Sequence, residues 1–481
     1  MLKTPEGGVR SVPFPIDDPE RIPVQRYYDQ AFYDAEVEHL WPHVWQMACR
    51  EEQLQEIGDW IEYENVGKSV IVVKTTTGIK AFHNACRHRG VPFAGGTTIG
   101  SSHATAHGNC AKTGFVCPFH GWRWNMDGEN TLVYGKHLFS DRQLKAEDIN
   151  LIPCRTEVWG GVVWINHDDD APSVKESLGP LADRLDAHNV GQLKAEWCYG
   201  TVLPANWKVA MEAFMEGYHV MQTHPQLHRP MEGVYWDPYD PNVPRNELQS
   251  NTKRVAMEGV TGKQAVDMQL HHLALLSEGM AGMVHPKEVE IAKAMPEVEH
   301  PESPEQAVPR WYGMVMKELT EKLRARGEPV PDLLAVAQSA PISAVEFLFP
   351  HYFLLPIFTS MSAYRIRPLG PESCFFEIWS LTFYPEGEEP EPVMEPTVLP
   401  FDSPEFPPIP RQDYANIPIQ QKGLHAQGFE YMRLSREMEG LISNFQRILD
   451  GYLAGVPQEK LALAQHHLAG NFDGPVRDLW E

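Results

Sequence analysis

Two short segments decide the fold, CRHRG at residues 86–90 and CPFHGWRW at residues 117–124. Each holds one cysteine and one histidine at short spacing. Thiolate and imidazole both bind zinc and iron, so two loops that each supply one of either kind can fill four coordination positions. The sequence therefore predicts a metal centre between two loops, with the ligands Cys86, His88, Cys117 and His120.

This donor set fits two kinds of centre, a structural zinc site and a [2Fe-2S] cluster whose two irons have different ligands. In a Rieske cluster one iron takes two cysteines and the other takes two histidines, so each loop must deliver one residue of each type. Both loops do so here, which favours the cluster and leaves zinc as the alternative. Two imidazoles in place of two thiolates raise the reduction potential, which suits a centre that accepts electrons and passes them on.

The two segments together resemble the paired ligand box of the Rieske non-haem iron aromatic ring-hydroxylating oxygenases, in their large (alpha) subunit. The resemblance extends beyond the ligands to Gly90, Pro118, Gly121 and Trp122. It implies that the two cysteines bind one iron of a Rieske [2Fe-2S] cluster and that the two histidines bind the other.

The gap between the two segments is longer than is usual in that family, with 28 residues between His88 and Cys117. The surplus lies in IGSSHATAHGNCAKTG, which contains His103, His107 and Cys110. These three residues could suggest another metal site. We expect instead a surface loop with unbound polar residues.

A second group of candidate ligands lies in NWKVAMEAFMEGYHVMQTH at residues 206–224, which predicts a helix closed by Pro225. Near its end stand His219 and His224. Two histidines and one distant carboxylate make the facial triad of mononuclear Fe(II) oxygenases, which leaves positions open for O2 and substrate. Residues five apart lie about 140° apart around an ideal helix, so His224 has to sit where the helix ends or distorts.

The same segment resembles the catalytic-helix signature of the Rieske oxygenases, which implies that both histidines bind a mononuclear Fe2+. The resemblance also selects the carboxylate. QDYANIPIQQKGL is similar to the family segment in which an Asp ligand precedes Gln-x-Gly-Leu, and this makes Asp413 the expected third ligand. Asp402 is the alternative, and a solvated loop carboxylate without metal is the competing interpretation.

The resemblance implies a role for Glu216 as well, three residues before His219. Its position is that of the acidic residue that bridges a cluster histidine of one subunit to an iron-binding histidine of the next, and so couples the two metals. Asn206 is a further candidate catalytic residue, although its place at the start of the helix first indicates an N-cap. The pocket-lining candidates, which equally fit a packed core, are Phe214, Met215, Tyr218 and Met221.

The composition argues against several other functions. The chain has 481 residues and a formal net charge of -24, from 41 Lys+Arg and 65 Asp+Glu, which argues against binding nucleic acid. It has no run of about 18 apolar residues, and its N-terminus lacks the apolar stretch of a signal peptide, so we expect a cytoplasmic protein without a membrane segment. Seven scattered cysteines do not form the pattern of a disulfide framework.

The expected fold class is α+β, with a small all-β Rieske domain. By the resemblance, a catalytic domain follows whose antiparallel sheet is covered by helices in the helix-grip (START-like) manner. The expected boundaries are 1–44 for an N-terminal helical arm, 45–170 for the Rieske domain and 171–481 for the catalytic domain. A helical pattern runs over 26–56 with a break at Pro42. We expect strands at 60–66, 69–75, 79–85, 158–168, 197–203, 345–358, 362–370 and 374–385, helices at 435–455, and insertions at 230–345 and 386–410.

The function that the resemblance implies is that of a terminal oxygenase component, which uses O2 and NADH electrons supplied by a separate reductase, with or without a ferredoxin. The leading substrate class is a small aromatic compound, which would be hydroxylated or dihydroxylated. Alternatives are a Rieske monooxygenase that removes O- or N-methyl groups, quaternary amines included, or hydroxylates a steroid, and a Rieske electron-transfer protein without oxygenase activity. Family members form trimers, so we expect a homotrimer or an α3β3 assembly with a small subunit.

Overall fold

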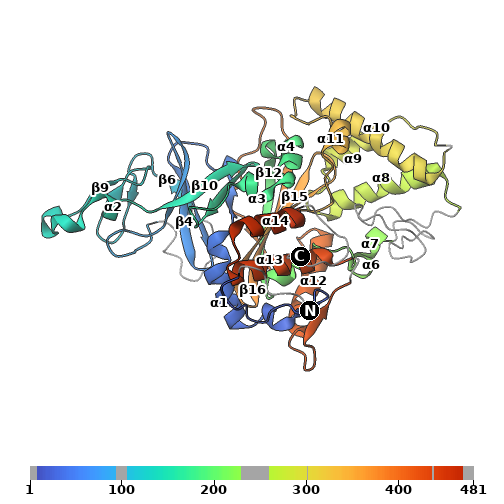
Figure 1. The fold of residues 1–481 in the computed structure, drawn as a ribbon. Helices are drawn as coiled ribbons and strands as arrows, with labels where there is room; N and C mark the ends of the chain where they lie inside the picture. The colour runs from blue at the N-terminus through green and yellow to red at the C-terminus, as the bar shows by residue number, and fades with distance from the viewer. Residues whose placement is uncertain (1–7, 94–105, 229–258, 301, 436–437, 470–481) are drawn as a thin grey trace.

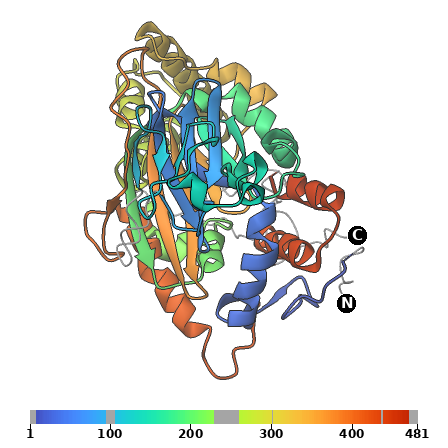
Figure 2. The ribbon, with the colours of Figure 1, turned by 90° about the vertical axis from the view of Figure 1, so that its left-hand side faces the viewer.

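The computed structural model describes residues 8–93, 106–228, 259–300, 302–435 and 438–469. A β-rich part that ends in a narrow tip lies beside a larger body of sheet and helices (Figure 1). Viewed from the side of the tip, the strands of the first part lie in front of the strands of the body (Figure 2). Within the described residues, no helix has the length and apolar character needed to cross a bilayer.

The β-rich part contains a seven-stranded antiparallel sheet in the order β2-β11-β10-β5-β4-β3-β6. The turn between β3 and β4 places Val66 and Gly67 at φ of 47° and 72°, the left-handed conformation that a two-residue hairpin needs. The strands are β2 (Gln46–Arg50), β3 (Asp59–Asn65), β4 (Lys68–Thr75), β5 (Gly78–His83), β6 (His107–Asn109), β10 (Pro153–Trp159) and β11 (Val162–Asn166).

A three-stranded sheet forms the tip, and a hydrophobic core of its own joins it to the larger sheet. This core contains Cys86 and Cys117 together with Trp122 and Trp124. Both candidate ligand loops are therefore anchored in the same small core. The elements of the tip are β7 (Phe115–Val116), β8 (Arg123–Trp124), β9 (Asn130–Leu132) and α2 (Ala146–Ile149).

The body is built on a six-stranded sheet in the order β13-β14-β15-β16-β12-β17, antiparallel except for the pair β12 and β17. Its long strands bury almost every residue, so both faces of the sheet are covered. The single strand expected at 345–358 is wrong, because the chain turns back after Leu348 and forms a hairpin. The strands are β12 (Lys194–Leu203), β13 (Glu346–Leu348), β14 (Tyr352–Pro356), β15 (Met361–Gly370), β16 (Ser373–Thr382) and β17 (Thr397–Val398).

Helices cover this sheet and position the second group of candidate ligands. α5 packs against β15 and β16, and α12 packs against β12 and α5. The C-terminal helices α13 and α14 lie against each other (Figure 1). The bounds are α5 (Trp207–Glu212), α12 (Pro408–Gly423), α13 (Gly440–Ala454) and α14 (Gln458–Ala469).

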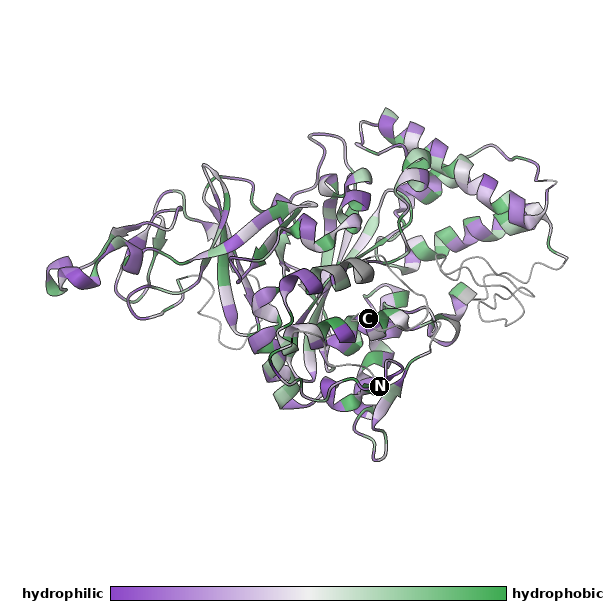
Figure 3. Cartoon of the chain, in the orientation of Figure 1, coloured by the Kyte–Doolittle hydropathy of each residue, from purple (hydrophilic) through white to green (hydrophobic). Residues whose placement is uncertain are grey.

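The region expected to be an insertion at 230–345 contains a group of helices in its described part. α10 shows why they form: a buried stripe repeats every four residues, and the opposite face is polar (Figure 3). The stripe consists of Ala307, Trp311, Val315, Leu319 and Leu323. The helices are α8 (Gly262–Gly279), α9 (Pro286–Lys293), α10 (Pro304–Ala325) and α11 (Leu333–Ser339).

The helical pattern expected over 26–56 is wrong in its second half. α1 (Gln30–His39) ends before Pro42, as expected, but the chain then enters β2, whose residues are all buried beside β11. The helix expected over 206–224 is also wrong, because α5 ends at Glu212 and a short helix, α6 (Val220–Thr223), begins only after a loop.

Buried charges fasten the N-terminal arm to the body. The Arg26 guanidinium lies 2.6 Å from Asp450, and the Lys208 ammonium lies 2.7 Å from Glu36, with all four side chains at most 1% exposed. Burial lowers the pKa of Lys208, against the raising effect of Glu36. The arm therefore shares the core of the body rather than standing apart from it.

An ionic contact also joins the two sheets. Arg365 on β15 pairs with Glu377 on β16 at 2.7 Å and donates to the carbonyls of Met47 and Ala48 on β2, at 2.9 and 2.7 Å. Because Arg365 and Glu377 are buried, the pair holds the β-rich part against the body at a fixed place.

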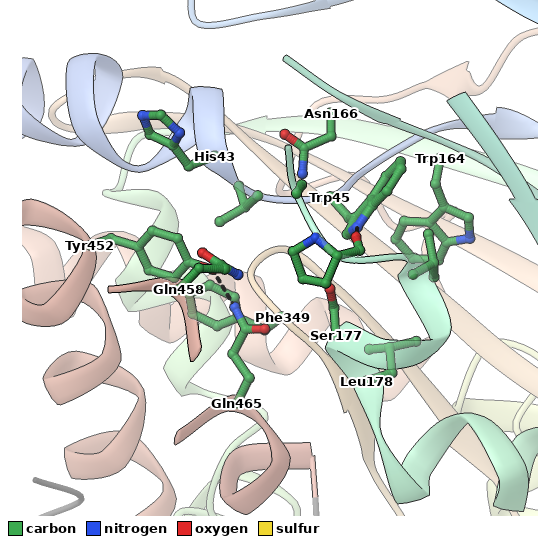
Figure 4. A pocket seen from close by; sticks show the side chains of 14 residues that line it. His43, Trp45, Trp164, Asn166, Ser177, Leu178, Phe349, Tyr452, Gln458 and Gln465 are labelled. Carbon is green, nitrogen blue, oxygen red and sulfur yellow. Dashed lines mark hydrogen bonds between the residues drawn. The ribbon is translucent and has the colours of Figure 1, made fainter. Parts of the chain in front are cut away.

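A narrow hollow lies where the arm, β11 and the C-terminal helices meet (Figure 4). Its wall is mostly aromatic and amide, with Trp45, Trp164 and Phe349 among its rings and Gln465 donating to the Tyr452 hydroxyl. None of the candidate ligands lines it, so this hollow is separate from the metal chemistry.

Removing one partner of the buried pair between Lys208 and Glu36 is expected to destabilise the fold. Lys208→Ala leaves the Glu36 carboxylate buried without its cation, which costs about 3–5 kcal/mol of the free energy of unfolding. Lys263→Ala is the matched control, because its pair with Asp267 is exposed and screened by solvent, so its loss should leave the free energy of unfolding nearly unchanged. Urea unfolding of both variants measures the difference in the free energy of unfolding. An equal decrease in the two variants would contradict the stabilising role of the buried pair.

Candidate metal centres

The two Cys-His loops are closed by the same hydrogen bonds. In each loop the cysteine amide donates to the carbonyl five residues later, and a glycine amide donates back to the cysteine carbonyl, at 2.8 to 3.0 Å. Gly90 and Gly121 have φ of 77° and 67°, which only glycine adopts without strain. The glycines of the sequence pattern are thus required by the turns that present the ligands.

The candidate cluster ligands meet between these loops. The rings of His88 and His120 lie 4.7 Å apart, and the Nδ1 atom of each is buried without a hydrogen-bond partner. Cys86 and Cys117 are both buried, and their thiols lie within hydrogen-bonding reach of each other. Buried nitrogens without partners are rare in native proteins, so the two Nδ1 atoms fit the role of ligands for a [2Fe-2S] cluster.

The insert between the loops places its candidate ligands apart in the described residues. β6 pairs with β3 and adds an edge strand to the sheet. His107 points to the surface, where its Nε2 lies 3.5 Å from Glu395, whereas Cys110 is buried and its pKa is raised by burial to about 11. His103 lies outside the described residues. The insert therefore supports the edge of the sheet.

The break in the expected helix brings the second group of ligands together. His219 precedes α6, and His224 ends it with φ of -121°, outside the helical range. The Nε2 atoms of His219 and His224 lie 3.7 and 3.0 Å from the same oxygen of Asp413, Oδ1. Three donors of the kind that form a facial triad therefore face one point.

Each of these histidines is held at its other ring nitrogen. Nδ1–H of His219 donates to Glu216 at 2.7 Å, and Nδ1–H of His224 donates to the Gln412 side-chain oxygen at 2.8 Å. Both acceptors are oxygens, so each ring carries its proton on Nδ1 and keeps the Nε2 lone pair for a metal. The residues at hand thus fit a mononuclear iron.

The sequence predicted that Glu216 and His219 lie on one helix. The structure instead places Glu216 in the loop before α6. Its second oxygen accepts a hydrogen bond from the His219 amide at 3.0 Å, which starts the new turn. Burial alone would lower the pKa of His219, but the hydrogen bond and charge of Glu216 and the charge of Asp413 raise it above its usual value.

Asp413 stands in the second turn of α12 and is 4% exposed. Asp402, the alternative third ligand, lies exposed in a turn and is not grouped with the two histidines. Gln412 is the residue that the sequence analysis missed. Its only signal in the sequence is its position directly before Asp413, because no motif of fixed spacing marks a glutamine that orients a histidine.

Asn206 forms the N-cap that its position predicts. Its side-chain oxygen accepts a hydrogen bond from the Lys208 amide at 2.9 Å, and its side-chain nitrogen donates to the Pro371 carbonyl at 2.7 Å. Both ends of the amide are thus engaged in holding α5. These contacts favour a structural role over the catalytic one.

The pocket-lining candidates fall into different environments. The Phe214 ring packs against Phe353, Tyr364 and Phe376, with centroids 5.1 to 5.6 Å apart, so it belongs to the core beneath the triad. Met215 is buried as well. Tyr218 is 57% exposed, and the side chain of Met221 lies outside the described residues.

Comparison with known families identifies both parts of the chain. Residues 44–136 match the Rieske [2Fe-2S] domain, and residues 184–455 match the ring hydroxylating alpha subunit (catalytic domain). The chain therefore belongs to the family of ring-hydroxylating oxygenase alpha subunits. This confirms the resemblance seen in the two loops and the expected α+β class with its Rieske and catalytic domains.

Three curated relatives show the range of this family. The carnitine monooxygenase oxygenase subunit of Escherichia coli is 30% identical over 207 residues, 42% of this chain and 52% of the relative. The glycine betaine monooxygenase oxygenase subunit of Chromohalobacter salexigens is 28% identical over 207 residues, 43% of each chain. The biphenyl 2,3-dioxygenase subunit alpha of Rhodococcus jostii is 30% identical over 210 residues, 42% of this chain and 43% of the relative. The matches span about half the length of these relatives.

Among solved structures, naphthalene 1,2-dioxygenase with indole bound in its active site has a TM-score of 0.58 to this chain, at 17% identity. The match covers 94% of this chain and 96% of that one. A likeness at this identity concerns the fold alone, and it agrees with the two-part architecture described above.

Asp413→Ala is expected to lose the mononuclear iron and to keep the cluster. The iron content should fall from about three to about two atoms per chain, because a facial triad that loses its carboxylate keeps only two weak points of attachment. Asp402→Ala is the control and should keep all its iron. Elemental analysis of the two purified variants shows which aspartate binds the iron. A full iron content in Asp413→Ala would rule out Asp413 as a ligand.

Proposed function

We propose that the protein is the terminal oxygenase component of a multicomponent system, which inserts oxygen from O2 into a small organic substrate with electrons from a separate reductase. The observation that carries this proposal is the meeting of His219, His224 and Asp413 at one point, in a chain that also holds the two Cys-His loops. A Rieske electron-transfer protein would need only the loops.

When bound, the metals supply electron storage in the loops and dioxygen chemistry at the triad. The chain supplies ligands of fixed orientation. Glu216 and Gln412 hold the Nδ1 protons of the two histidines, so neither ring can turn its Nε2 atom away from Asp413. The aromatic rings packed around Phe214 include Tyr364, which is fully buried and close enough to Asp413 for the two to interact electrostatically, so this side of the site is closed by packed rings.

The substrate class that we propose is a quaternary ammonium compound, as in the N-demethylation alternative above, rather than an aromatic ring. The support comes from the carnitine and glycine betaine monooxygenase subunits, to which the chain is similar. Oxygen insertion into a C–H bond next to the quaternary nitrogen gives a carbinol, whose C–N bond then breaks to release an aldehyde and a tertiary amine. One O2, two electrons and two protons from solvent enter; one water leaves on oxygen insertion, and the hydroxyl proton of the carbinol leaves when the C–N bond breaks.

Dihydroxylation of an aromatic compound is the second candidate. It is favoured by the similarity to the biphenyl 2,3-dioxygenase subunit alpha, which matches at the same identity as the carnitine enzyme. The two candidates differ in product, since a dioxygenase leaves both oxygen atoms on the ring and a monooxygenase leaves one on the substrate.

We also propose a trimer, in which the cluster of one subunit serves the triad of its neighbour. The tip and α6 lie on opposite sides of the molecule, which disfavours transfer within one chain (Figure 1). The surface around the second ligand loop exposes large apolar side chains, as a docking surface would. They are Phe119 at 56%, Tyr134 at 74% and Leu138 at 78% exposure.

The substrate proposal is tested with the purified protein, a matching reductase and NADH. The panel is L-carnitine, gamma-butyrobetaine and glycine betaine on one side and biphenyl and naphthalene on the other. We expect NADH and O2 consumption coupled to release of a tertiary amine from one of the ammonium compounds, with one labelled oxygen atom from 18O2 in the aldehyde. A ring diol as the product would establish the second candidate instead.

The bridge role of Glu216 is tested by the rate at which O2 reoxidises the reduced cluster in the presence of substrate. Glu216→Gln should slow this step by at least about tenfold while leaving the cluster absorption unchanged, since it removes the charge that orients His219. Glu216→Asp should restore part of the rate. Unchanged reoxidation in Glu216→Gln would contradict the proposal.

A further inference from the structure

A third cluster of metal-binding side chains lies in the β-rich part, outside both centres. It consists of His83 at the end of β5, Cys154 on β10 and His167 directly after β11. These three strands are neighbours in the seven-stranded sheet, so their side chains meet although they are far apart in the sequence. One donor atom from each residue lies within 4.8 Å of the other two.

The geometry of this cluster is close to that of a zinc site. The Sγ atom of Cys154 lies 3.9 Å from Nδ1 of His167, and the two imidazole rings lie 5.3 Å apart at an angle of 31°. Sulfur and nitrogen atoms bound to one tetrahedral zinc are about 3.6 Å apart, given bond lengths of about 2.3 and 2.1 Å. The donors therefore need to move by no more than about 1 Å, which side-chain rotation supplies.

The two imidazoles are in the charge state that a metal binds, whereas the thiol first has to lose its proton. Burial lowers the pKa of His167 to about 4, and burial and the charge of Lys68 lower the pKa of His83, so both imidazoles are neutral near pH 7 with lone pairs available. Burial raises the pKa of Cys154 to about 12, and its thiol donates to the Asn166 carbonyl at 3.3 Å. The thiol therefore stays protonated until a metal displaces the proton.

We propose that His83, Cys154 and His167 bind a divalent zinc ion, with a solvent molecule in the fourth position. Two imidazoles and one thiolate are ligands that zinc prefers, whereas calcium and magnesium require oxygen. Binding releases the thiol proton to solvent and involves no change of oxidation state. The exposed Asp169 carboxylate acts electrostatically on His83 and Cys154 and opposes the positive charge of Lys68.

The proposed zinc, although its fourth position holds solvent, acts on the fold. It ties the ends of three adjacent strands, and His83 stands three residues before Cys86, so the ion fixes the strand that leads into the first ligand loop. Metal bound by the folded protein alone adds its binding free energy to the stability of the fold. This proposal does not depend on the oxygenase reaction, since it concerns a site apart from both iron centres.

The experiment measures zinc in the iron-loaded protein. Wild type, Cys154→Ser and His167→Ala are equilibrated with limiting zinc and separated from free metal, and zinc and iron are counted together. Cys49→Ser is the matched control, because Cys49 is equally buried in the same sheet and its pKa is also raised to about 12. We expect about one zinc per chain in wild type and in Cys49→Ser, and at least about a tenfold loss of affinity in the other two.

A second measurement shows whether sulfur is a ligand. Cobalt added in place of zinc should give a thiolate-to-cobalt charge-transfer band in the near-ultraviolet difference spectrum of wild type and Cys49→Ser, and no such band in Cys154→Ser. The visible circular dichroism of the cluster verifies that each variant is folded, and His167→Ala, at a half-buried position, keeps the test valid if Cys154→Ser does not fold. Equal zinc binding by wild type and both variants, or no zinc in wild type beyond the iron centres, would overturn the proposal.

Discussion

The arrangement of the catalytic body depends on one geometric constraint: two histidines five residues apart must present their Nε2 atoms to the same carboxylate oxygen. An unbroken helix would point them about 140° apart. The chain meets the constraint by ending α5 at Glu212, whose buried carboxylate accepts hydrogen bonds from Tyr27 and Gln446. In the loop that follows, Glu216 accepts a hydrogen bond from the His219 amide just before α6 and holds the His219 ring. The arm contacts this break through Tyr27, and α12 contacts it through Asp413 and Gln412.

In the two Cys-His loops, too, a backbone turn orients the ligands. There the hydrogen bonds are local, and glycines with positive φ complete the turns. The triad instead joins segments far apart in the chain, so its precision rests on packing. Buried pairs such as Arg26 with Asp450 and Lys208 with Glu36 hold the arm, and Arg365 with Glu377 fixes the β-rich part. Loops and triad are thus both rigid parts of one molecule.

Much of the fold could be predicted from the sequence, because its signals are local. Alternating and apolar runs marked most strands, and the Cys-His spacing marked the loops. The break after Glu212 could not be predicted, since Phe214 and Met215 continue a helical spacing while their partners lie on the distant sheet. Asp413 was predicted only from the resemblance to the family. Gln412 was predicted neither from that resemblance nor from the residue pattern. The helices at 262–339 were missed because their Pro and Glu content suggested an insertion, although the four-residue stripe of α10 was present in the sequence.

The central claim is that one chain houses two different iron centres, one made by thiolates and imidazoles and the other by imidazoles and a carboxylate. Analysis of iron and acid-labile sulfide, together with electron paramagnetic resonance of the reduced protein, tests this most directly. The account predicts about three iron and two sulfide per chain and the paramagnetic resonance signal of a reduced, histidine-ligated diiron cluster. Zinc alone in the loops, with no sulfide and no such signal, would contradict it.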